Sequence, residues 1–321
     1  MNRMLKATAV ATLCCTAAAG LGYIGVAQAK GDGGLGVRDA ASAAWTTRTV
    51  HAADRADAFV GEKKINVGGH AVNVSCEGRQ SRRGPVVVLV AGLGDGLDKM
   101  ADLQKTLSKK NRVCSYDRLG EGKSDKPEGP QSMADTGRVL TGVINRVAGD
   151  SPVVLAGHSL GGLIAARYAP DHRDKVKGLV LLDATSSTTS ADVTRAIPES
   201  ATGDAGDLRA QTVAVMQGQN PENLVVPDGR VRSAGWIPTQ VIRHGQPYLS
   251  EFPTYGPQLE ADWTKGQYAW AAVSGRATVH KAEGSGHYIY VDRKDIAVKS
   301  IQRVAAQVTQ RNGGWWGHAG R

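Results

Sequence analysis

Short runs of β-branched and aliphatic residues, each followed by a helix-like segment, constrain the fold of this chain most. The run "GPVVVLVAGLG" has the continuous apolar character of a strand that is buried on both faces of a parallel sheet. "PVVLAG" and "VKGLVLLDAT" repeat this character further along the chain. The segments around 99–109, 133–147 and 160–169 have helical patterns. Strands that alternate with helices predict a mostly parallel α/β sheet flanked by helices.

The remaining segments extend this sheet at both ends. "EKKINVGGHAVNVSCEG" alternates apolar and polar residues on either side of Gly68-Gly69, which predicts a β-hairpin. "RVCSYDRLG", "WIPTQVIRHG" and "ATVHKAEGSGH" are expected to be strands, and "DIAVKSIQRVAAQV" a closing amphipathic helix. Residues 185–235 are rich in Ser, Thr, Asp and Gly with weak helical patches. We interpret them as a cap insertion over one end of the sheet, or else as a solvated loop.

The first 29 residues have the pattern of a secretory signal peptide. Arg3 and Lys6 precede an apolar stretch, and Ala27-Gln28-Ala29 fits a small-x-small cleavage site. Residues 30–60 are expected to be an extended lead-in, and residues 61–321 the folded domain. The pattern predicts a secreted, extracellular protein with no stable membrane insertion after cleavage. The alternative is an uncleaved membrane anchor.

Charge and motif content limit the partners and cofactors. The net charge of +9 falls to +7 without Arg3 and Lys6, and the basic residues are scattered rather than gathered with aromatics. We therefore expect no nucleic-acid binding. "GEGKSD" lacks a phosphate-binding loop because Asp117 stands where that loop needs glycine. No zinc-like spacing occurs, so neither a metal nor a cofactor is expected. No oligomeric state is predicted.

Ser159 lies between two glycines in "VVLAGHSLGGLIAARY" (residues 153–168). A G-x-S-x-G pattern occurs by chance in glycine-rich chains, but here an apolar run precedes it and a helical stretch follows, the setting that a nucleophilic serine requires. Gly157 and Gly161 give room for a sharp turn. The N–H of Leu160 would then lie at a helix N-terminus and help to bind an oxyanion. The alternative is an ordinary polar loop residue.

Three motifs in this order resemble the α/β-hydrolase superfamily over nearly all of residues 61–311. "GHSLGG" resembles the nucleophile elbow of that family, "YDRLGEGKSD" the loop after its fourth strand, and "GSGHYIYVD" the segment that carries its catalytic histidine. The resemblance implies an α/β-hydrolase fold with a small cap and a serine, histidine and acid acting together.

The resemblance implies His287 as the base that accepts the serine proton. His244 ends an expected strand and is a weaker alternative. The acid departs from the commonest family pattern, because no Asp follows Gly245 at the usual spacing. Some members carry the acid after the sixth strand, where this chain has Asp183.

An Asp at the end of a buried apolar strand is costly without a partner, which favours a role for Asp183. The first alternative acid is Glu251, followed by Asp262 or Glu260. The resemblance also implies Leu93, in the loop after "VVVLVAGLG", as the second backbone oxyanion donor beside Leu160.

Cys76 and Cys114 remain after signal cleavage and form a candidate pair in an oxidising compartment. In the resembled family the second strand lies beside the fourth. Cys76 ends the former and Cys114 lies within the latter, so the resemblance predicts a disulfide between them.

A serine, histidine and acid with two backbone donors perform acyl transfer through an acyl-enzyme. The sequence therefore predicts a secreted hydrolase of small-molecule carboxylic esters. An aminopeptidase, a thioesterase or a perhydrolase of the same fold would share these motifs. A catalytically inactive binding protein is the alternative of a different class. The polar cap sequence favours small or polar esters over a lipid surface.

Overall fold

Eight strands form one sheet in the order β1-β2-β4-β3-β5-β6-β7-β8 in a computed structural model that describes residues 59–81 and 84–314. The expected signal peptide, and all of the lead-in before residue 59, lie outside the described residues. The strands are β1 (Gly61–Val67), β2 (His70–Glu77), β3 (Val86–Val90), β4 (Arg112–Tyr116), β5 (Val153–His158), β6 (Val176–Leu182), β7 (Thr239–His244) and β8 (Ala277–Ala282).

The strands pair in the directions that the sequence patterns predict. β1 and β2 pair antiparallel around the predicted Gly68-Gly69 turn, and β2 also pairs antiparallel with β4. The pairs from β4 and β3 through β8 are parallel. Every residue of β3, β4 and β5 is buried, as the apolar runs of β3 and β5 predict for strands that are covered on both faces. The mostly parallel α/β sheet is thereby confirmed.

Helices cover both faces of the sheet. Val86, Val88 and Val90 of β3 join a core with α3 (Met133–Ala148) and α4 (Ser159–Tyr168), which pack on one face. Val87 and Leu89 point to the opposite core, which α2 (Ala101–Ser108), α8 (Ile289–Asp292) and α9 (Lys294–Gly314) complete. Short 3₁₀ turns, η1 (Leu97–Met100) and η2 (Ala169–Asp171), precede α2 and follow α4.

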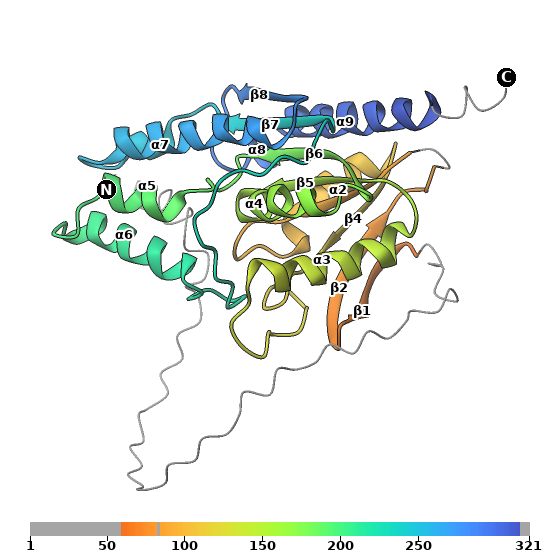
Figure 1. Cartoon of the computed structure of the whole chain (residues 1–321), viewed down its shortest axis with the longest axis horizontal. Coiled ribbons are helices and arrows are strands. Elements are labelled where there is room, and N and C mark those ends of the chain that lie inside the picture. Colours follow the sequence, from red (N-terminus) through yellow and green to blue (C-terminus); the bar gives the residue numbers. More distant parts are fainter. Residues whose placement is uncertain (1–58, 82–83, 315–321) are drawn as a thin grey trace, which may run out of the picture.

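Three helices gather at one end of the sheet (Figure 1). α5 (Thr189–Ala196) and α6 (Gly203–Met216) form where the sequence indicates an insertion, and α7 (Gly256–Ala269) follows β7 between the 3₁₀ turns η3 (Tyr248–Glu251) and η4 (Trp270–Val273). These elements share a separate apolar cluster that includes Ile197, Leu208 and Trp263. We call α5, α6 and α7 the cap.

The disulfide between Cys76 and Cys114 is present and links register partners on β2 and β4. The two Cα atoms are 4.1 Å apart, since adjacent antiparallel strands place directly opposite residues close together. Among residues 59–81 and 84–314, no helix combines the length and the apolar character that crossing a bilayer would require.

Candidate active site

The backbone at Ser159 is forced into a strained turn at the junction of β5 and α4. Its φ is 51°, a left-handed value that non-glycine residues rarely adopt. A Cβ on Gly161 would lie 2.3 Å from the carbonyl oxygen of Val90, and one on Gly157 would lie 2.4 Å from the carbonyl oxygen of Gly161. Only glycine fits at both positions, so the sequence pattern around Ser159 has a steric cause.

Asp183 and His287 meet beside this turn. Asp183 follows β6 with a φ of 45°, and His287 lies in the loop between β8 and α8. The Nδ1 of His287 donates to Oδ2 of Asp183 over 2.7 Å. This bond leaves the Nε2 of His287 as the atom that can accept a proton. The hydrogen bond between His287 and Asp183 therefore supports Asp183, rather than Glu251, as the acid.

Asp183 is completely buried, and three further groups donate to its carboxylate. His244 donates through its Nδ1 at 2.9 Å and its backbone N–H at 3.1 Å, and the indole Nε1 of Trp263 donates at 3.1 Å. Burial by itself would raise the pKa of Asp183, but hydrogen bonds from His244 and His287 outweigh it and hold this pKa well below its ordinary value. Asp183 is thus a fixed negative charge.

His244 connects Asp183 to a second carboxylate. Its Nε2 donates to Oε1 of Glu260 over 2.7 Å. Burial opposes the charged imidazole, yet hydrogen bonds to Asp183 and Glu260 raise the pKa of His244 to about 9. At neutral pH it is an imidazolium between two carboxylates. The sequence places His244 at a strand end but carries no local sign of the Glu260 contact, because α7 supplies that partner.

His158 contacts the loop that carries His287. Its Nε2 donates to the carbonyl oxygen of His287 over 3.1 Å, and the two rings lie 4.5 Å apart. Burial lowers the pKa of His158 well below its usual value, so this ring is neutral. His158 therefore points to the loop of His287 while its neighbour Ser159 forms the turn.

The hydroxyl of Ser159 rests against Thr185, whose Oγ1 lies 3.4 Å from it. Ser159 is 8% exposed, and His287 is 9% exposed. In serine hydrolases the hydrogen bond from a catalytic serine to its base is often formed only when substrate is bound. The Thr185 contact defines the resting orientation of the nucleophile.

The two expected oxyanion donors belong to segments that flank Ser159. Leu160 is in the first turn of α4. Leu93 follows Gly92, and a Cβ added to Gly92 would lie 3.4 Å from the Cβ of Ser159. Arg118 donates to the carbonyl of Gly92 over 2.8 Å and forms a buried ion pair with Glu222 at 2.7 Å. This ion pair, which the sequence did not indicate, anchors the loop of Leu93.

The other proposed acids have different partners. Glu251 is exposed at the end of η3, and Asp262 pairs with Arg195 at 2.8 Å. Glu260 contacts His244 rather than His287. Within the described part of the chain, no group of three or more His, Cys, Asp or Glu side chains is arranged to hold a metal ion.

A small cavity adjoins Thr185 and Trp263 beneath the cap. Its volume is about 50 Å³, and apolar side chains of Val193, Leu208 and Leu259 line it together with hydroxyl and carboxylate groups. Asp192 and Asp262 are among the latter, and both pair with Arg195. The cavity can receive a small acyl group but offers no unpaired carboxylate among the described residues that line it.

Comparison with known proteins agrees with this architecture. The sequence model of a family described as alpha/beta hydrolase fold matches residues 85–214, which is less than half of the chain. A (lyso)-N-acylphosphatidylethanolamine lipase of Homo sapiens is 33% identical over 115 residues, which cover 35% of this chain and 33% of the lipase. An uncharacterized protein of Mycobacterium bovis is 28% identical over 157 residues, 49% of this chain and 40% of that protein. The chain thus spans less than half the length of these curated relatives.

Solved structures extend the likeness to most of the chain. The crystal structure of the enol-lactonase from Burkholderia xenovorans LB400 covers 75% of this chain and 99% of its own, with a TM-score of 0.52 and 19% identity. A likeness at this identity concerns the fold alone.

Proposed function

Because this chain belongs to the α/β-hydrolase fold superfamily, we propose that it is a serine hydrolase that cleaves carboxylic esters through an acyl-enzyme. The observation that carries the proposal is the 2.7 Å bond from His287 to the fully buried Asp183, next to a serine with a φ of 51°. Strained backbone and buried, charge-coupled side chains concentrate at functional sites.

In the proposed reaction, Oγ of Ser159 attacks the ester carbonyl while its proton passes to Nε2 of His287. The carbonyl oxygen gains the negative charge, which the N–H groups of Leu160 and Leu93 stabilise. Collapse of the intermediate breaks the ester C–O bond, and His287 returns the proton to the leaving alcohol. Water then repeats the sequence and releases the carboxylic acid. Asp183 remains ionised and stabilises the imidazolium.

Small acyl groups are the proposed substrates. The cavity of about 50 Å³ beside Thr185 has room for only a few carbon atoms. An aminopeptidase needs a carboxylate for the substrate amine, whereas Asp192 and Asp262 in this cavity are both held by Arg195. This pairing favours an ester without an amino group. The predicted signal peptide supports secretion, and the disulfide is compatible with an oxidising compartment.

The test compares the protein with Ser159→Ala on a panel of esters, thioesters and aminoacyl amides graded by acyl length. We expect short-chain ester hydrolysis to fall about 10⁴- to 10⁶-fold in the variant. A fluorophosphonate probe should label the parent at Ser159 and leave the variant unlabelled. Equal hydrolysis rates, or absence of labelling in the folded parent, would refute the proposal and favour a binding protein. Faster turnover of thioesters or aminoacyl amides would correct the substrate class.

A further inference from the structure

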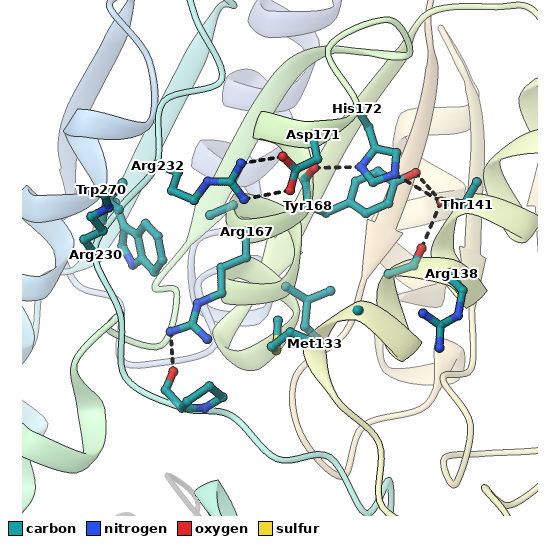
Figure 2. A pocket seen from close by; sticks show the side chains of 16 residues that line it. Met133, Arg138, Thr141, Arg167, Tyr168, Asp171, His172, Arg230, Arg232 and Trp270 are labelled. Atoms are coloured by element: carbon teal, nitrogen blue, oxygen red, sulfur yellow. Dashed lines mark hydrogen bonds and ion pairs between the residues drawn. The ribbon is translucent and has the colours of Figure 1, made fainter. Parts of the chain in front are cut away.

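A second, larger cavity lies away from the proposed catalytic residues. It has a volume of about 470 Å³ and is bounded by α3, the far end of α4, η2 and residues 227–232 (Figure 2). Tyr168 on its wall is nine residues after Ser159 on α4, a separation of about 13 Å along the helix axis. The proposed reaction uses none of the residues that line this cavity.

Four arginines surround this cavity, and two of them form no ion pair with a carboxylate of the described residues. Arg232 pairs with Asp171, and Arg138 pairs with Asp135 on the same helix. Arg167 donates only to carbonyl oxygens, at 2.7 Å to Pro227 and 3.3 Å to Ser187.

Arg230 is exposed, and neither Arg167 nor Arg230 forms an ion pair with a described carboxylate. Arg167 is half-buried, and burial lowers its pKa by more than the nearby charge of Asp228 raises it. An anion in the cavity would offset that unfavourable environment.

The remainder of the lining is apolar, with a few hydrogen-bonding groups. Met133, Ile164 and Val231 contribute aliphatic surface. Trp270 also lines the cavity, is 1% exposed, and its indole Nε1 is buried with no hydrogen-bond partner among the described residues. Burying a donor without an acceptor is costly, so an acceptor atom from a ligand would relieve this defect.

Three polar side chains form another part of the cavity wall. The rings of Tyr168 and His172 stack 3.6 Å apart, and the hydroxyl of Thr141 lies 2.9 Å from that of Tyr168. Figure 2 shows these three side chains grouped together on the right, with Arg167 in the centre and Arg230 beside Trp270 on the left. Cationic, apolar and hydroxyl surfaces therefore meet around one cavity of the size that small ligands occupy.

We propose that this cavity binds a small carboxylate with an aliphatic body. The guanidinium groups of Arg167 and Arg230 match the negative charge and planar shape of a carboxylate. Met133, Ile164 and Val231 bury the hydrocarbon part. A multiply charged ion such as phosphate fits less well, because Asp171 and Asp135 already neutralise Arg232 and Arg138.

Calorimetric titration of the full chain tests the proposal with three probes: octanoate, octanol and inorganic phosphate. Octanoate should bind saturably, and octanol and phosphate should each bind at least tenfold more weakly. Arg230→Gln should weaken octanoate binding about tenfold by removing a charge-assisted contact. Lys299→Gln, which removes one positive charge from α9 on the opposite face of the sheet, is the matched control and should change nothing.

A second variant fills the cavity without touching any arginine. A Cβ on Gly137 of α3 would have one neighbour within 4 Å among the described residues, Tyr168 at an ordinary distance of 3.7 Å, so a side chain can begin here, and Gly137→Leu is designed to place aliphatic atoms in the space. It should abolish octanoate binding while thermal unfolding stays cooperative. Octanoate binding that survives both Gly137→Leu and Arg230→Gln would overturn the proposal. So would an absence of saturable binding, or equal affinity for octanol.

Discussion

The two ends of α4 border two cavities that differ in size and in charge. At its start, the cavity beneath the cap measures about 50 Å³, and its carboxylates are paired with Arg195. At its end, the arginine-lined cavity measures about 470 Å³, and two of its arginines, Arg167 and Arg230, form no ion pair with a described carboxylate. The larger cavity has the features of a binding site, whereas the smaller one adjoins the strained serine and the buried acid. Cavity volume alone would have selected the end of α4 that lies away from the proposed catalytic residues.

Several hydrogen bonds connect the segments that border the two cavities. Asp228, in the segment that borders the arginine-lined cavity, accepts from the backbone N–H groups of Ser190 (3.1 Å) and Ala191 (2.7 Å) in the first turn of α5. Arg167 also reaches the carbonyl of Ser187 at 3.3 Å. We expect this connection to fix the cap in place while the two cavities act independently, and the following variants test that independence.

Asp183→Asn should have the largest effect. The substitution preserves shape but removes the charge that orients and stabilises His287, so kcat for a short-chain ester should fall about 10⁴-fold. Octanoate binding at the other end of α4 should be unchanged in a titration. Glu251→Gln, at an exposed position, is the matched control and should retain full activity. Loss of activity in Glu251→Gln alone would identify a different acid.

His244→Gln should have the next largest effect. It removes the imidazolium that links Asp183 to Glu260, and the resulting displacement of Asp183 should lower kcat/KM about tenfold or more. His280→Gln, an exposed position on the adjacent strand β8, is the control and should not alter the rate. An unchanged rate in His244→Gln would show that His287 and Trp263 hold Asp183 without help.

The same variant should change the pH dependence of stability. The pKa of His244 is raised in the folded protein from 6.5 to about 9, so the stability that it contributes is fully present below pH 6.5 and is lost as pH rises through 9. The Tm difference between the parent and His244→Gln should therefore be largest near pH 6 and narrow toward pH 10. A constant difference, measured by thermal unfolding across this range, would contradict the charged state of His244.

Leu208→Ala should change the preference for acyl-chain length, by a smaller factor than the preceding variants change the rate. Leu208 on α6 lines the cavity beneath the cap and is 7% exposed, so truncation leaves room for more methylene groups. The ratio of kcat/KM for a hexanoyl ester to that for an acetyl ester should rise about tenfold. Val231→Ala removes aliphatic volume from the arginine-lined cavity and should leave the ratio unchanged. Equal shifts in both variants would mean that the two cavities are coupled.

Local sequence patterns predicted the sheet well because each strand carries its own signal. The hairpin at Gly68-Gly69 and the buried runs before Gly92 and Ser159 coincide with β1–β2, β3 and β5. The helix α7 was not predicted. Its buried residues, which include Trp263 and Gln267, are mixed with exposed polar ones. Only packing against the other cap elements gives this segment a defined face.

Contacts between distant residues limited the prediction of the site. His287 was inferred from a family motif and Asp183 from its place at the end of a buried strand, and 104 positions separate them in the chain. Glu260 was considered only as an alternative acid, and Arg118 lies in the motif after the fourth strand without an expected role, although they contact His244 and the loop of Leu93. The arginine-lined cavity shows the same limit, since α3, α4 and residues 227–232 are scattered along the chain. Scattered basic residues gave no sign of a common site.

Thr185→Val should have the smallest effect, and in the opposite direction. The hydroxyl of Thr185 lies 3.4 Å from that of Ser159. This contact competes with the hydrogen bond to His287 that the proposed reaction needs. Valine keeps the shape of the cavity and removes this competing contact. Since such a long hydrogen bond contributes about 1 kcal/mol at most, kcat/KM should rise no more than about fivefold. A tenfold fall in steady-state ester hydrolysis would instead mean that the Thr185 hydroxyl takes part in the reaction, and octanoate binding should be unaffected in either case.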